Sequence, residues 1–443
     1  MKDTLDLSAL LPRLSAAVTR VEPRPVHGRV REVRGILVHA SLPTARIGEL
    51  CHLRDPVNDR LIPAEVIGFE DNLVVLSAIG DLHGLSAQCE VIPTGRTLQI
   101  PVGEALLGRA IDPMGRPLEP DALPLRDCVL RPVQSEPPPP LSRQIVRQPL
   151  ALGVSAIDGL MTIARGQRIG IFGEPGSGKS TLLSAIVTGS EADVIVIGLV
   201  GERGREVREL LEVQLPPAAR TRTVAVVTNS DRPAIERVKC AHAATTVAEF
   251  FRDLGLDVLL LLDSVTRFAR AQREIGLAAG EPPTRRGFPP SFFSDLPRLL
   301  ERAGPGKTGS ITGIYTVLTE GDMTLDPVAE ETKSILDGHI MLSADLAQRG
   351  HFPAIDVLQS RSRLMNAVTN ARHQELAARI RDNMATYREI ELLLRAGEYI
   401  RGADPKVDTA IDLQPKINAF LRQHTTDGAN LDDTISQMEA ILK

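Results

Sequence analysis

The stretch Gly173-Glu174-Pro175-Gly176-Ser177-Gly178-Lys179-Ser180 decides how the rest of the chain is interpreted. It matches the pattern G-x-x-x-x-G-K-[ST], in which backbone N–H groups surround the phosphates of a nucleotide. Lys179 then neutralises the β- and γ-phosphate oxygens, and the Ser180 hydroxyl ligates Mg²⁺. The apolar run 168–172 precedes the motif and a helical stretch follows it, so a helix N-terminus also faces the anion. We therefore predict a nucleoside triphosphate site formed by Gly173, Glu174, Pro175, Gly176, Ser177, Gly178, Lys179, Ser180 and Thr181.

Length and composition narrow the class of protein. A chain of 443 residues predicts about two to four domains. There is no apolar run long enough to span a membrane and no basic-then-apolar N-terminal leader, so we expect a cytosolic protein. The four cysteines have no C-x-x-C spacing, which favours reduced thiols over a zinc site or a disulfide framework. A net charge of −5 and 3% aromatic residues argue against a nucleic-acid partner.

The pattern of residue types changes along the chain and predicts four parts. Residues 1–25 carry leucines near helical spacing, which fits either a partner-binding helix or a frayed terminus. Residues 26–95 contain short β-branched runs between turns, typical of a small β-barrel. Residues 96–365 alternate apolar strands with helices, which predicts an α/β domain with a mostly parallel sheet. In residues 366–443 the stretches 375–384, 386–394 and 433–443 have helical periodicity and predict a C-terminal helical domain.

Two further strands end in charged residues that suit phosphate chemistry. The apolar run 258–262 ends in Asp263, as in a Walker B strand that places a metal-organising carboxylate at its tip. The run 193–200 is followed by Glu202 and Arg203, which could act as a water-activating base and its orienting or phosphate-facing partner. The same cluster also fits a solvated helix start, because acidic residues favour a first turn. The residues alone leave these two interpretations open.

A resemblance to a known family separates them. The segments 201–207, 263–274, 287–290 and 319–322 resemble the rotary-ATPase-related export ATPases, most closely the type III secretion (injectisome) branch. That branch is similar to the flagellar export ATPases and to the catalytic subunit of ATP synthase. The segments 136–144 and 228–237 resemble the injectisome branch more than the flagellar one. The resemblance covers about residues 26 to 440.

The resemblance implies an N-terminal β-barrel, a RecA-like ATPase domain and a C-terminal helical domain, assembled as a homo-hexamer with ATP between subunits. It implies that Lys179 binds phosphate, that Ser180 and, through water, Asp263 serve Mg²⁺, and that Glu202 activates water beside Arg203. Phe352 is implied as the platform for adenine. Arg363 is implied as the arginine finger, with Arg361 two residues away as the alternative.

The implied function is ATP hydrolysis coupled to chaperone release, substrate unfolding and export. Implied partners are stator and central stalk proteins, the export gate and chaperone–effector complexes, at the cytoplasmic face of the bacterial inner membrane.

Alternatives are a flagellar export ATPase, a non-catalytic ring subunit, which would lack the glutamate at position 202, and a nucleic-acid translocase. The barrel region has one aromatic residue, Phe69, which disfavours the translocase. We expect the series Arg267, Arg270 and Arg273 to form salt bridges with a neighbouring subunit or at the solvent surface.

Overall fold

The computed structural model describes residues 26–57, 59–119, 124–319, 326–424 and 427–443. The predicted N-terminal segment 1–25 and most of the motif 319–322 lie outside these residues. The chain divides into two compact units, residues 1–97 and 98–443, and each is described by itself. Among the described helices, none is both long and apolar enough to cross a membrane.

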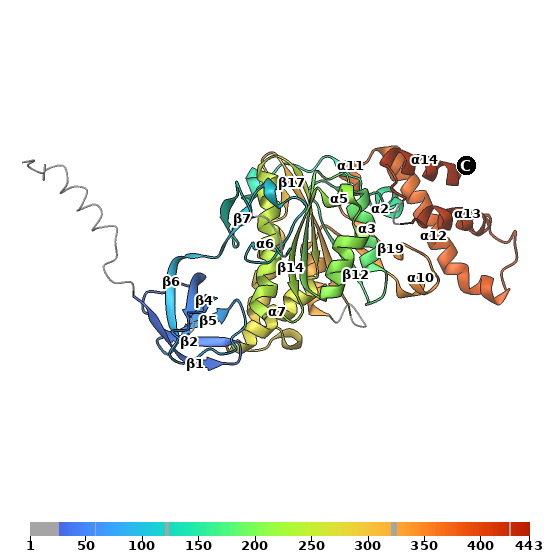
Figure 1. The fold of residues 1–443 in the computed structure, drawn as a ribbon. Coiled ribbons are helices and arrows are strands. Elements are labelled where there is room, and N and C mark those ends of the chain that lie inside the picture. The colour runs from blue at the N-terminus through green and yellow to red at the C-terminus, as the bar shows by residue number, and fades with distance from the viewer. Residues whose placement is uncertain (1–25, 58, 120–123, 320–325, 425–426) are drawn as a thin grey trace, which may run out of the picture. The chain divides into compact units, whose positions relative to one another are not determined.

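The first unit is a closed antiparallel barrel with the strand order β1-β2-β5-β4-β3-β6, drawn in blue in Figure 1. Its side chains alternate between a buried interior and the surface, as in β3, where Cys51 and Leu53 are buried and their neighbours are not. The predicted β-barrel is confirmed. Its strands are β1 Gly28–Arg34, β2 Leu37–Ser41, β3 Glu49–Arg54, β4 Leu61–Glu70, β5 Leu73–Ala78 and β6 Glu90–Thr97.

The second unit contains a mostly parallel sheet with the order β19-β18-β12-β17-β15-β13-β14-β8, in which β19 is antiparallel to β18. A short strand, β16, pairs with β17 off this path. The predicted α/β fold is confirmed. The strands are β8 Ala110–Ile111, β12 Arg168–Gly173, β13 Val194–Glu202, β14 Thr223–Asn229, β15 Asp257–Asp263, β16 Gly304–Pro305, β17 Ser310–Leu318, β18 Gly338–Leu342 and β19 Ile355–Ser362. Two small pairs, β7 Gln99–Val102 with β9 Val129–Pro132 and β10 Pro149–Leu150 with β11 Ile163–Ala164, complete the strands.

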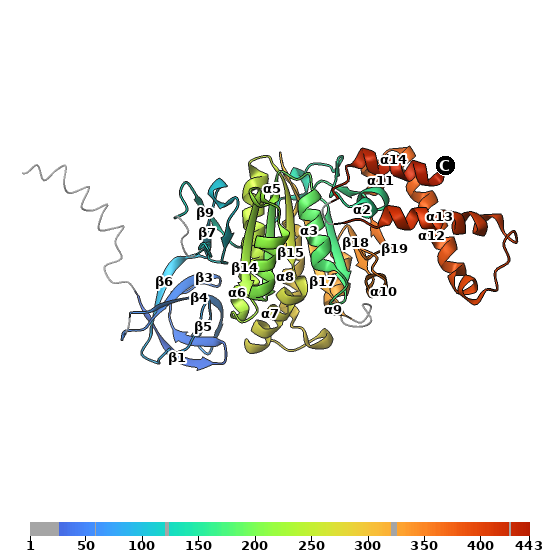
Figure 2. The ribbon, with the colours of Figure 1, turned by 45° about the vertical axis from the view of Figure 1, so that its right-hand side comes forward.

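Helices cover both faces of this sheet, which explains why its central strands are continuously apolar (Figure 2). Alternate strand residues such as Ile171, Ile197 and Leu261 share a core with α3 and the C-terminal helices. The α6 helix packs against the strands β13, β14 and β15, and α7 packs against β17. The helices of this part are α2 Ser155–Leu160, α3 Lys179–Gly189, α4 Gly204–Glu209, α5 Pro217–Arg220, α6 Ala234–Asp253, α7 Val265–Ala278, α8 Pro290–Glu301, α9 Pro327–Ile335, α10 Ala344–Gln348 and α11 Met365–Val368.

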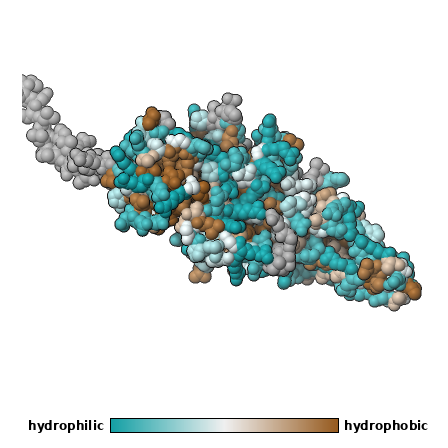
Figure 3. Space-filling view, turned by 90° about the horizontal axis from the view of Figure 1, so that it is seen from below, coloured by the Kyte–Doolittle hydropathy of each residue, from teal (hydrophilic) through white to brown (hydrophobic). Residues whose placement is uncertain are grey.

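The C-terminal part is helical, as predicted. The long helix α12 (Ala371–Ala396) ends at Gly397, whose left-handed backbone (φ 73°) favours glycine. It packs against α13 (Pro405–Leu421), and α14 (Leu431–Leu442) packs on both. Leu392, Leu393 and Ile400 are exposed near the connection between α12 and α13, and Figure 3 shows apolar residues on the surface at this end. The predicted domain limits at 25/26, 95/96 and 365/366 stay predictions.

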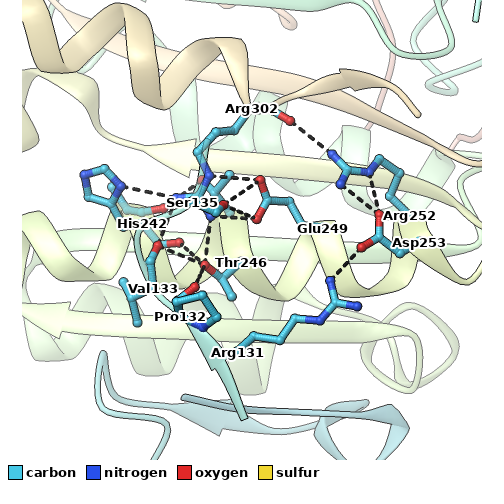
Figure 4. A network of polar contacts seen from close by, with 12 residues as sticks. Arg131, Pro132, Val133, Ser135, His242, Thr246, Glu249, Arg252, Asp253 and Arg302 are labelled. Atoms are coloured by element: carbon cyan, nitrogen blue, oxygen red, sulfur yellow. Dashed lines mark hydrogen bonds and ion pairs between the residues drawn. The ribbon is translucent and has the colours of Figure 1, made fainter. Parts of the chain in front are cut away.

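A buried network of charges fixes the connection that follows β9 to α6 and α8 (Figure 4). Arg302, 1% exposed, donates to both carboxylate oxygens of Glu249 at 2.9 and 2.7 Å. It also donates to the Val133 carbonyl at 3.0 Å, and Ser135 donates to Glu249 at 3.0 Å. Desolvation, and next the charge of Arg302 (Nη1 to His242 Nδ1, 3.3 Å), lower the pKa of the buried His242 imidazole. Because the charges of Arg302 and Glu249 are both satisfied by hydrogen bonds, we interpret this network as one that stabilises the fold.

Candidate active site

The phosphate-binding motif forms an open loop between β12 and α3. Gly176 and Gly178 have φ angles of +83° and +85°, a left-handed conformation that other residues rarely adopt. α3 begins at Lys179, and the side chains of Ser180 and Thr181 in its first turn are exposed. The free N–H groups of the first turn and both hydroxyls are therefore available to an anion.

Asp263 lies at the end of β15 and contacts the lysine of the loop. Lys179 Nζ forms an ion pair with Asp263 Oδ1. The carboxylate is buried, and the same oxygen accepts a hydrogen bond of 2.7 Å from Thr316 Oγ1 on β17. The structure thus brings the predicted phosphate-binding lysine and the predicted metal-organising carboxylate into contact.

Glu202 is the last residue of β13 and is 5% exposed. Its Oε2 accepts a hydrogen bond of 3.1 Å from Arg267 Nη2. Its Oε1 is buried and has no hydrogen-bond partner within the described part of the chain. Burial, and next the negative charge of Asp263, raise the pKa of Glu202 to about 7. A buried carboxylate with one open oxygen and a pKa near neutrality is suited to accept a proton.

The arginine that contacts this glutamate is not the one the sequence suggested. Arg203 has a side chain that is 74% exposed, and it pairs with Glu206 at 3.7 Å. Arg267, on α7, donates instead to the Gly201 carbonyl and to Glu202. For Arg267 the expectation of a solvent or inter-subunit salt bridge is wrong. A signal was present in the sequence, because Arg267 is four residues past Asp263, on a helix that must begin beside the tip of β13 once β13 and β15 pair.

These side chains surround a pocket of about 230 Å³. Lys179, Ser180, Asp263 and Glu202 line one part of it, and α4 and the π-helical turn Leu210–Gln214 close another. Glu206 reaches the pocket from α4. Predicted residues from three separate strand ends therefore meet at one edge of the sheet, where ligands bind in open α/β folds.

Phe352 lies over the glycine loop. A Cβ atom on Gly178 would come within 3.1 Å of the Phe352 ring, so the loop and the ring are in direct contact. Phe352 is 38% exposed, so part of its surface is open to a planar group. It lies three residues before the start of β19, which begins opposite Leu342 at the same edge of the sheet as the loop.

Arg363 lies at the other end of that strand. Gly338 pairs with Ser362 and Leu342 pairs with Ile355, so β19 runs from the nucleotide edge to the opposite edge. Its eight residues span roughly 25 Å at about 3.3 Å per residue. Arg361 and Arg363 are both exposed, and neither is among the described residues that line the pocket. The structure therefore separates Arg363 from the phosphate loop of its own chain.

Most of the chain matches domains of known protein families. Residues 153–362 match the nucleotide-binding domain of the ATP synthase alpha/beta family, and residues 30–95 match its beta-barrel domain. Residues 369–440 match the T3SS EscN ATPase C-terminal domain. The type 3 secretion system ATPase of Sinorhizobium fredii is 52% identical over 442 residues, which cover 99% of this chain and 98% of the relative. The chain belongs to the type III secretion system ATPases.

Two solved structures and a flagellar relative are also similar to this secretion ATPase over most of its length. The assembled ATPase EscN of enteropathogenic E. coli superposes with a TM-score of 0.89 at 48% identity, covering 94% of this chain and all (100%) of EscN. EscN in complex with its central stalk EscO gives 0.87 at the same 48% identity, with 94% and 100% coverage. The flagellum-specific ATP synthase of Bacillus subtilis is 43% identical, covering 94% of this chain and 95% of the relative. The family is thus related to the flagellar export ATPases.

Proposed function

We propose that this secretion ATPase hydrolyses ATP at the interfaces of a homo-hexameric ring. The observation that carries the proposal is the course of β19, which holds Phe352 beside the phosphate loop and Arg363 at the opposite edge of the sheet. A guanidinium placed there cannot reach the γ-phosphate of its own subunit, whereas it can serve a neighbour as an arginine finger. The assembled form of EscN supports such a ring.

Within one subunit, each side chain of the pocket would have a separate role in the reaction. Lys179 would release Asp263 and pair with the phosphates, while backbone N–H groups of residues 174–178 surround them. Glu202 would orient the attacking water and accept its proton through Oε1, which has no partner within the part of the chain that the structure describes. Arg203, exposed at the start of α4, is the proposed phosphate-facing neighbour, and Arg267 holds the second oxygen of Glu202.

The residues present fit Mg²⁺ as the implied metal. Mg²⁺ prefers oxygen ligands and keeps several waters, so one hydroxyl, one carboxylate and the substrate phosphates suffice. Ser180 offers the exposed hydroxyl and Asp263 the carboxylate, which would act through water. No group of three or more His, Cys, Asp and Glu side chains that could hold a metal occurs among the described residues. When bound with ATP, the ion would neutralise phosphate charge.

We further propose that hydrolysis is coupled to chaperone release, substrate unfolding and export. The complex of EscN with its central stalk EscO supports a stalk partner for this chain. Stator proteins, the export gate and chaperone–effector complexes are the other proposed partners. The proposed location is the cytoplasm, with peripheral attachment to the bacterial inner membrane.

Mixing two inactive variants tests the ring. Lys179→Ala removes the phosphate lysine, and Arg363→Ala removes the finger while leaving its own P-loop intact. An interface that combines the P-loop of one variant with the finger of the other is complete, so the mixture should regain part of the ATPase activity. Arg361→Ala in place of Arg363→Ala is the matched control, because it should be active alone.

Mixed rings that assemble without regaining activity admit two explanations: the finger does not act in trans, or every interface must be active at once. Adding each variant to wild-type protein separates them. If all interfaces must be active, a minority of either variant lowers activity more steeply than its fraction. Activity that falls in proportion to the added variant in a chain shown to stay monomeric would contradict the hexamer.

A further inference from the structure

The Asp263 carboxylate has a second side-chain donor besides Lys179. Thr316 is fully buried on β17, and its Oγ1 lies 2.7 Å from Asp263 Oδ1. The other acceptor within reach of the same hydroxyl, the Leu262 carbonyl, is farther away at 3.3 Å. A hydroxyl donates one hydrogen, so the shorter contact to the carboxylate is the better hydrogen bond.

The position of Thr316 is set by the centre of the sheet. β17 lies between β12, which leads into the phosphate loop, and β15, which ends in Asp263. Thr316 pairs with Ile171 of β12, and its neighbour Tyr315 pairs with Leu262 of β15. Beyond it, Leu318 N donates to Thr266 Oγ1 at 2.8 Å, and Thr319 N donates to the Gly173 carbonyl at 3.1 Å. The strand is therefore tied on both sides, and the hydroxyl is held in place.

We propose that Thr316 is a positioning residue for the Asp263 carboxylate toward a hydrated divalent cation. The inference rests on the proposed function, in which Asp263 organises Mg²⁺ and Lys179 moves to the phosphates. When Lys179 leaves, Oδ1 loses one of its two side-chain donors and keeps the hydrogen bond from Thr316. That bond prevents the carboxylate from rotating while its charge partner changes. Hydrogen-bonding partners behind a metal-organising group change metal affinity or activity about 10- to 100-fold.

Variants of Thr316 and a matched control test this role. Thr316→Val keeps the shape and removes the donor, Thr316→Cys keeps the size with a weak donor, and Thr316→Ser keeps the hydroxyl. Thr312→Val is the control: Thr312 is on the same strand and face, is equally buried, and accepts from Gly166 N at 2.9 Å, four residues from the site. If Thr316→Val does not fold, Thr316→Cys supplies the measurement.

Two readouts are needed. The first is the affinity for Mn²⁺ in the presence of a non-hydrolysable ATP analogue, from the electron paramagnetic resonance signal of the free ion. The second is the Mg²⁺ concentration for half-maximal ATP hydrolysis. Thr316→Val should weaken both about 10- to 100-fold and Thr316→Cys somewhat less, while Thr316→Ser stays within about threefold of wild type. Thr312→Val should leave both unchanged, even if it lowers the unfolding temperature.

The outcomes distinguish this inference from the proposed function. Asp263→Asn should weaken the metal more than any Thr316 variant. If Asp263→Asn leaves the metal dependence unchanged, the proposed role of Asp263 fails. If Asp263→Asn weakens the metal and neither Thr316→Val nor Thr316→Cys does, or if Thr312→Val weakens it equally, the positioning role of Thr316 is overturned.

Discussion

Two buried glutamates, Glu202 on β13 and Glu249 on α6, each contact an arginine from a different part of the chain, and their carboxylates are satisfied to different degrees. Both oxygens of Glu249 accept from Arg302, at 2.9 and 2.7 Å, and Ser135 adds a third donor. Glu202 has one bond of 3.1 Å from Arg267, and its other oxygen has no partner among the described residues. Both are ion pairs between a buried glutamate and an arginine, and they differ in how many hydrogen bonds the carboxylate accepts.

The difference separates a structural pair from a functional one. A buried charge is stabilised when all of its hydrogen-bonding capacity is used, as in the Glu249–Arg302 pair. Glu202, by contrast, has one oxygen without a partner among the described residues. Burial and the neighbouring Asp263 raise its pKa to about 7. The oxygen that has no partner among the described residues is the one that can interact with a substrate water.

The largest effect should come from Glu202→Gln. The amide keeps the shape of the side chain and loses its basicity, so turnover should fall about 10²- to 10⁴-fold while ATP binding is retained. Steady-state hydrolysis and binding of a fluorescent ATP analogue measure the two quantities. Glu206→Gln, in the same pocket, is the matched control and should keep most of the turnover. A loss of binding as large as the loss of rate would make Glu202 structural as well.

Glu249→Gln should have the opposite profile. It leaves the buried Arg302 without a counter-charge, which lowers the free energy of unfolding by about 3 to 5 kcal/mol. Turnover per folded molecule should stay near the wild-type value, because the network lies outside the nucleotide pocket. Denaturant unfolding and hydrolysis assays on the same preparation measure both. Unchanged stability would mean that the Glu249 network does not stabilise the fold.

The pH dependence should distinguish the glutamates next. Because the pKa of Glu202 rises from 4.5 to about 7 on folding, the folded state holds a proton that the unfolded state has released between these pH values. Its contribution to stability therefore decreases by about 3 kcal/mol as the pH rises through this window, and it changes no further at higher pH. Glu202→Gln should be more stable than wild type at pH 8, and the difference should vanish near pH 4.5.

Activity should show the same ionisation. Wild-type turnover should fall about tenfold per pH unit below pH 7, as Glu202 becomes protonated and can no longer act as a base. Unfolding midpoints and hydrolysis rates measured across pH 5 to 8, an interval of about three units around this pKa, check both effects. An activity profile that is flat through this range would contradict the assignment of Glu202 as the base.

The smallest effect should come from Ser135→Ala. Glu249 loses one neutral donor and keeps both bonds from Arg302, so the free energy of unfolding should fall by about 0.5 to 1.5 kcal/mol. Turnover and its pH profile should not change. A loss as large as that of Glu249→Gln would show that the network depends on Ser135 rather than on the ion pair.

The fold was predictable where its strands are buried on both faces. The runs in β12, β13 and β15 are almost entirely apolar, and the sequence predicted each of them. β19 was not predicted, because it lies at one end of the sheet and carries polar residues such as Gln359 and Arg361. α13 was also missed, since Pro415 interrupts its helical pattern. The stretches 375–384 and 386–394, predicted separately, form the single helix α12.

The sequence by itself determined the local parts of the site. Two glycines with left-handed backbone, a lysine at a helix start and carboxylates at strand ends depend only on consecutive residues, so their pattern is visible in the chain. Tertiary structure alone decided which distant side chains meet them. It placed Arg267 rather than Arg203 on Glu202, Thr316 on Asp263 and the Phe352 ring on Gly178. These contacts follow from strand order and register, which join segments up to 174 positions apart in the chain, the separation of Phe352 from Gly178, and no local pattern encodes them.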